Sequence, residues 1–238
     1  MQLAEDFPIE ANIRLIVASP MRRAIYTAIE TFRTFLPDDH GRDIIALPLL
    51  QETTDFRCDI GSPSKDLQAE VEGSKLPVDL KSLVGENWIV KKSGKYEPTF
   101  SKLRDRVQEA RRWLRRRPEK EIAVVTSGSF LRVLTNDWED SNIYQGMVFK
   151  CSSTIIRISM LTETRSGTGW ANAEYRIYEL NLEDEKSNMQ NASMQETMES
   201  RSRRGVFSPP LAPDCQKELS RATLQSWANQ GYTLNSTQ

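Results

Sequence analysis

Residues 122–138 read IAVVTSGSFLRVLTNDW, and this single stretch joins a strand pattern to a helix pattern. Its first part, 122–126, is a short run of branched apolar residues, which is typical of a buried β-strand. Its second part, 129–137, has the spacing of a helix. A buried strand that leads directly into a helix is the unit from which α/β sheets are built.

The same alternation extends outward from this stretch in both directions. Apolar runs of strand length are followed or preceded by amphipathic segments. The predicted strands are 14–18, 44–47, 122–126, 153–160 and 171–180, and the main predicted helices are 20–36, 100–114 and 129–137. This order predicts a three-layer α/β/α sheet with helices on both faces.

The domain organisation follows from changes in composition. Residues 1–182 are expected to form one domain, in which 53–94 is a polar, proline-punctuated insertion over one end of the sheet. Residues 183–238 are rich in polar side chains and poor in large apolar ones, which predicts a disordered tail. A short helix at 215–230 is the exception expected within it.

Charge and cysteine content exclude several classes of function. Lys and Arg (32) nearly balance Asp and Glu (33), so overall charge does not favour nucleic acid or a membrane surface. The basic cluster 111–117, RRWLRRR, has acidic neighbours and is interpreted as a solvated helix face. The three cysteines show no metal-binding spacing, so neither a metal nor another cofactor is expected. Without a signal peptide or an apolar span, a cytoplasmic location is expected.

Three segments together resemble the phosphoglycerate mutase-like proteins of the histidine phosphatase superfamily, in their fungal form, over about residues 13–180. They are LIVASPMRRAIYT at 15–27, LQETTDFRCDIGS at 50–62, and 122–138. The resemblance implies that Arg23 binds phosphate and that Glu52 is the acid that protonates the leaving alcohol. The physical argument agrees for Arg23, since a guanidinium at a helix start after a strand suits an anion. The alternative interpretations are a surface arginine and a solvated loop carboxylate.

The third segment departs from the family pattern at its centre. Ser127 stands where the family has a histidine, and a serine cannot carry positive charge. Ser127, Gly128 and Ser129 at the helix start, and Asn172 in WANAE (170–174), are the remaining candidate anion-binding residues.

The nucleophilic Arg-His-Gly motif of the family occurs nowhere in the sequence, and His40 is the only histidine. The chain is therefore expected to be truncated at its amino end, to lack the family's first strand, and to be a degenerate phosphatase that binds a phosphorylated small molecule or a protein partner. Two alternatives remain. One is a phosphomonoesterase or phosphomutase whose start is truncated or misassigned. The other is an auxiliary enzyme of secondary metabolism that uses Glu52 as acid or base.

A missing central strand would leave its neighbours with unpaired edges. Either another segment fills the gap, or the chain forms a homodimer or aggregates. Poor behaviour as an isolated monomer is expected.

Overall fold

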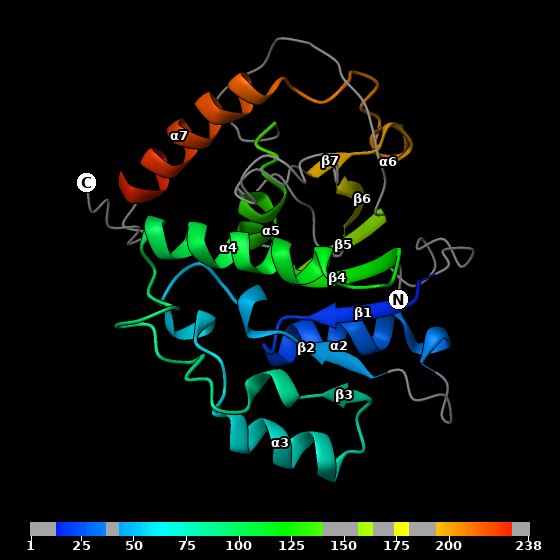
Figure 1. The fold of residues 1–238 in the computed structure, drawn as a ribbon, viewed down its shortest axis with the longest axis vertical. Coiled ribbons are helices and arrows are strands. Elements are labelled where there is room, and N and C mark those ends of the chain that lie inside the picture. Colours follow the sequence, from blue (N-terminus) through cyan, green and yellow to red (C-terminus); the bar gives the residue numbers. More distant parts are fainter. Residues whose placement is uncertain (1–12, 37–42, 140–156, 164–173, 181–193, 230–238) are drawn as a thin grey trace.

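A seven-stranded sheet is the centre of the molecule, with the strand order β3-β2-β1-β4-β5-β6-β7 (Figure 1). The computed structural model describes residues 13–36, 43–139, 157–163, 174–180 and 194–229. The strands are β1 (Leu15–Ala18), β2 (Ile44–Ala46), β3 (Val78–Asp79), β4 (Glu121–Ser127), β5 (Arg157–Glu163), β6 (Tyr175–Leu180) and β7 (Met194–Glu196). Strands β1 to β5 pair in parallel, and β6 and β7 add to the sheet as antiparallel strands.

The helices are α2 (Arg22–Thr31), α3 (Ser64–Gly73), α4 (Phe100–Arg115), α5 (Gly128–Thr135), α6 (Met198–Arg203) and α7 (Pro213–Asn229). Helices α2, α4, α5 and α7 fall on segments that were predicted to be helical, whereas α3 and α6 lie in the predicted insertion and tail. Short 3-10 turns are η1 (Arg33–Phe35), η2 (Pro48–Leu50), η3 (Arg57–Asp59) and η4 (Lys81–Leu83). Helix α4 begins where the Thr99 side chain accepts a hydrogen bond from the Lys102 amide at 3.3 Å. Helix α5 ends at Asn136, whose φ of 56° is left-handed.

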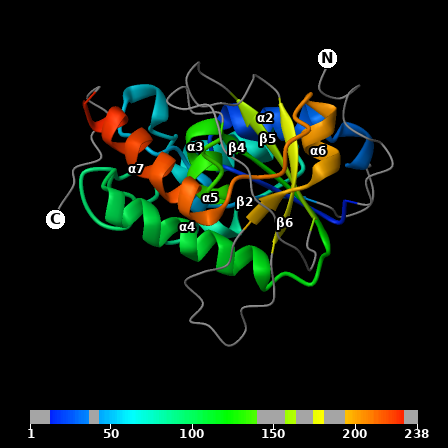
Figure 2. The ribbon, with the colours of Figure 1, turned by 90° about the horizontal axis from the view of Figure 1, so that it is seen from above.

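Two hydrophobic cores lie on the two faces of the sheet. Along β1, Ile16 and Ala18 belong to the core that contains α2, whereas Leu15 and Val17 belong to the core that contains α4 and α5. This alternation is what the two-residue repeat of a strand requires when both faces are covered. Figure 2 shows α2 and α4 on opposite sides of the sheet. The predicted three-layer α/β/α architecture is confirmed.

The sheet is continuous on both sides of β4. Strand β4 pairs with β1 on one side and with β5 on the other, from Glu121↔Arg157 to Ser127↔Glu163.

The insertion 53–94 is folded and packs against the core and the edge of the sheet. Its helix α3 contributes Leu67 and Val71 to the core, and its strand β3 extends the sheet by parallel pairing with β2. Trp88 is fully buried in this insertion. It packs so closely on Gly61 that a Cβ atom there would lie 1.8 Å from the indole, so only glycine fits.

The prediction of a disordered tail is wrong for residues 194–229. Strand β7 pairs with β6, and helices α6 and α7 follow it. The tail has few large apolar side chains, but it is held by polar groups that composition does not reveal. The buried Arg201, for example, is bound by Glu139 at 2.6 and 2.9 Å. The helix predicted at 215–230 is confirmed as α7.

In the ranges that the structure describes, no helix combines the length and the apolar character needed to cross a membrane.

Candidate functional site

The candidate site lies at the carboxyl ends of β1, β2 and β4. Because these strands are parallel neighbours, the residues that follow them meet at one edge of the sheet. Arg23 lies in the first turn of α2 after β1, Glu52 follows η2 after β2, and Ser127 is the last residue of β4. Three segments that are distant in sequence thus converge.

The Glu52 carboxylate is the centre of this site. Arg23 Nη2 donates a hydrogen bond to Glu52 Oε1 at 2.7 Å, and Ser129 Oγ donates to Glu52 Oε2 at 3.0 Å. The hydroxyl groups of Ser127 and Ser129 are 3.4 Å apart. Four of the candidate residues named from sequence therefore lie in one cluster, while Asn172 and His40 are outside the described residues.

Arg23 is held by acceptors on two sides. Its Nη1 donates to the Cys58 carbonyl at 2.6 Å, and its Nη2 is 3.5 Å from Asp59 Oδ1 in addition to its contact with Glu52. The side chain keeps 39% of its surface exposed, while Glu52 and Asp59 keep 12% and 13%. The guanidinium is accessible, but its charge is offset by two carboxylates.

The start of helix α5 supplies the second part of the site. Ser127 is its N-cap residue in extended conformation, and its side chain makes no capping hydrogen bond. The first amides of a helix have no partner within the helix and carry partial positive charge. Gly128 is buried at this first turn, so its main chain lies directly beside the Ser127 and Ser129 hydroxyl groups. This is a suitable place for an anion.

Two buried cationic side chains, which were not predicted from sequence, bind the main-chain carbonyl of Glu52. Lys91 Nζ and Arg106 Nη2 each donate to the Glu52 carbonyl oxygen at 3.0 Å, and both residues are only 4% exposed. Arg106 also lies over the Phe130 ring at 4.9 Å. The signal for Arg106 was available, since it falls on the apolar face of α4 between Leu103 and Val107, where a charged residue is unexpected.

Further contacts fix the turn that carries Glu52. The Thr126 hydroxyl of β4 donates to the Leu50 carbonyl, and Gln51 Nε2 donates to the Trp88 carbonyl at 2.8 Å. Glu52 is therefore attached to both the central sheet and the insertion.

Comparison with known proteins identifies the family of the chain. The family model of the histidine phosphatase superfamily (branch 1) matches residues 1–170, which is well over half of the chain. The chain belongs to this superfamily. It is 33% identical over 130 residues to a probable phosphatase of Schizosaccharomyces pombe, an alignment that covers 55% of this chain. The chain spans 56% of the length of that relative.

In this member of the superfamily, burial lowers the pKa values of Lys91 and Arg106, the two cationic residues that bind the Glu52 carbonyl. Burial and, to a smaller extent, the charge of Arg106 lower the pKa of Lys91 to about 7, although Glu52, Asp59 and Asp55 oppose the shift. Burial likewise lowers the pKa of Arg106 to about 10. Lys91 is thus a group at the site that changes charge near neutral pH.

The described part of this histidine phosphatase homologue contains no group of His, Cys, Asp and Glu residues that could hold a metal ion.

Proposed function

We propose that this chain is a degenerate member of the histidine phosphatase superfamily, which binds the phosphate group of a small phosphorylated molecule without phosphohistidine turnover. The ligand would accept from Arg23 and from the amides and hydroxyl groups at the start of α5. The observation that carries this proposal is Ser127 at the start of α5, within 3.4 Å of Ser129 and beside the Arg23–Glu52 pair.

Ser127, in place of the histidine of the family, favours phosphate binding over catalysis. A serine hydroxyl can donate one hydrogen bond to a phosphate oxygen, but it cannot supply the positive charge of an imidazolium. Charge that develops on a transferring phosphoryl group is stabilised chiefly by preorganised positive groups, so turnover loses more than ground-state binding does. Ser127 is internal to the chain.

The pairing of Arg23 supports weak and competitive anion binding. A phosphate that reaches Arg23 must take over donors now shared by Glu52 and Asp59. A phosphate dianion is the stronger acceptor of a bidentate guanidinium fork, so the exchange is favourable but incomplete.

A thermal-shift titration with inorganic phosphate and orthovanadate tests the proposal. The unfolding temperature of the wild-type chain should rise saturably with either anion, because a ligand that binds only the folded state stabilises it. Arg23→Gln should abolish the rise. Arg22→Gln is the matched control, since the neighbouring Arg22 binds Glu70 instead of Glu52. Equal shifts in all three proteins would refute an anion site at Arg23.

A working phosphomonoesterase or phosphomutase is the second candidate, and the similarity to a probable phosphatase of Schizosaccharomyces pombe favours it. It requires a nucleophilic histidine, which the present sequence does not place at this site. Phosphate release from generic phosphomonoesters that is lost in Arg23→Gln would favour this candidate.

The third candidate is an enzyme of altered chemistry that uses Glu52 as acid or base. The 3.0 Å contact between Ser129 Oγ and Glu52 Oε2 is its support, because it places a hydroxyl beside a carboxylate. An unchanged activity of Glu52→Ala on the true substrate would exclude it.

A further inference from the structure

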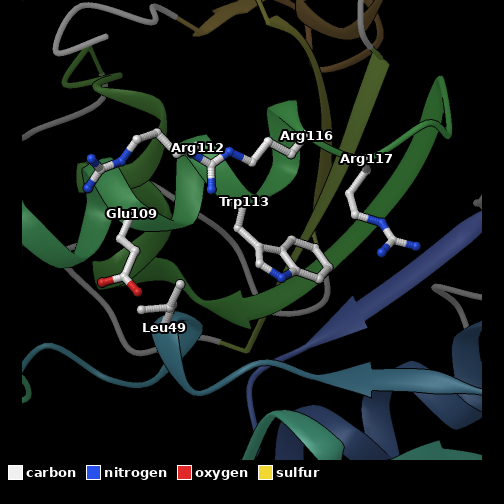
Figure 3. Close-up of a pocket in the computed structure, with 6 residues that line it drawn as sticks. All are labelled: Leu49, Glu109, Arg112, Trp113, Arg116 and Arg117. Atoms are coloured by element: carbon white, nitrogen blue, oxygen red, sulfur yellow. The ribbon is translucent and has the colours of Figure 1, made fainter.

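A hollow of about 550 Å³ lies along helix α4 and its carboxyl end, and Glu52 is not among the residues that line it (Figure 3). One wall consists of positions 109, 112 and 113 of α4 and of positions 116 and 117 at its end, which are spaced three and four residues apart. Leu49 of η2 forms the opposite side. The volume is within the range of roughly 300–1,000 Å³ typical of small-molecule sites.

The charges around the hollow leave an excess of positive charge. The carboxylate of Glu109 accepts from Lys95 at 2.8 Å, and Arg117 is bound by Glu119 at 2.7 and 3.0 Å. Arg112 and Arg116 are exposed, lie one helical turn apart, and form no ion pair with any side chain that the structure describes. Two guanidinium groups are therefore free to bind an anionic group bidentately.

The floor of the hollow is aromatic and rigid. Trp113 is half-buried, packs against the core beneath α4, and has the Arg117 guanidinium 5.3 Å from its ring centre. Figure 3 shows the indole projecting from α4 toward the side where Leu49 lies, with Arg112 and Arg116 on the helix above it. A flat ring can therefore pack against Leu49 and the part of Trp113 that Arg117 leaves open to the hollow, while its anionic substituent reaches the two arginines.

We infer that this hollow is a binding site for a small aromatic anion, separate from the Glu52 site. The apolar floor selects a flat ring, and Arg112 and Arg116 select the negative group. A nucleic acid is disfavoured because it needs a basic stripe that continues over the surface, whereas Asp105 and Glu119 lie in and just beyond the same helix.

The test uses the full chain labelled with 5-fluorotryptophan and observed by ¹⁹F NMR, with 1-naphthalenesulfonate as the probe. The resonance that disappears in Trp113→Phe identifies Trp113. Titration should shift this resonance saturably, and Arg112→Gln/Arg116→Gln should weaken the affinity at least about tenfold, as expected for the loss of two charge-assisted contacts. Both arginines are exposed, so the double variant should fold normally.

Two controls make the result specific. Arg104→Gln removes an exposed arginine of α4 outside the hollow and should leave the affinity unchanged. Arg23→Gln should also leave it unchanged, so failure of this site is distinguishable from failure of the phosphate site. A Trp113 resonance that does not move, or that moves equally in the double variant, would overturn the inference. So would a short RNA or an acidic peptide that binds Trp113 more tightly than the aromatic probe.

Discussion

At the residue scale, the lowered pKa of Lys91 makes the stability of the folded chain depend on pH. Its ammonium group is buried behind Glu52 and faces Arg106, Glu52, Asp59 and Asp55. Because burial lowers its pKa from 10.5 to about 7, the folded state releases this proton at lower pH than the unfolded state does. The unfolded chain then binds more protons between about pH 7 and 10.5, so this residue makes stability rise with pH in that interval.

Lys91→Met should remove that pH dependence. Relative to the variant, the wild-type unfolding free energy should increase from pH 7 to pH 10, with a slope of at most about 1.4 kcal/mol per pH unit for one proton. Urea unfolding of both proteins across this range measures the difference. Lys92→Met, at the exposed neighbouring lysine, is the control and should follow the wild type. Parallel pH profiles for wild type and Lys91→Met would contradict a buried, weakly basic Lys91.

Substitution of Glu52 is expected to have opposite effects on phosphate affinity under the binding proposal and under an acid–base role. Glu52→Gln keeps the side-chain volume but removes a negative charge 2.7 Å from Arg23. Under the binding proposal, phosphate affinity should increase about three- to tenfold, since roughly 1 kcal/mol of competing attraction is removed. Isothermal titration with inorganic phosphate measures this. Reduced affinity would mean that Glu52 helps to hold the ligand, as an acid–base role requires.

At the element scale, an ion pair attaches helix α6 to the segment that follows α5. The fully buried Arg201 binds Glu139 bidentately and donates to the Ser208 carbonyl at 2.7 Å. Arg201→Met should lower the unfolding free energy by about 3–5 kcal/mol, because Glu139 would lose its partner in a partly buried place. Lys217→Met, on an exposed position of α7, should change stability by less than about 0.5 kcal/mol. Equal effects of the two substitutions in urea unfolding would show that α6 does not depend on this pair.

The elements also show what sequence can predict here. Strands such as β1 and β4 and helices such as α4 are encoded by local periodicity, so their places were predictable. The meeting of Arg23, Glu52 and Ser127 followed from the edge shared by parallel strands, together with the family resemblance. The role of Lys91 and the fold of residues 194–203 were not predictable, because both depend on pairing between polar groups distant in sequence. Composition alone treats such groups as solvated.

At the scale of the whole molecule, the sheet ends in short edge strands. Strand β3 has two residues and β7 has three, and short edges pair poorly with other chains. Sizing chromatography should give one peak near the chain mass of 27.2 kDa. A stable dimer peak would instead favour the homodimer considered from sequence.

Binding of a phosphate group at Arg23 without turnover can be measured by calorimetric titration with p-nitrophenyl phosphate, followed by measurement of p-nitrophenol in the same cell. We expect a saturable heat that is absent in Arg23→Gln, and no p-nitrophenol beyond the buffer blank. Release of p-nitrophenol in proportion to protein, lost in Arg23→Gln, would instead show a working phosphatase.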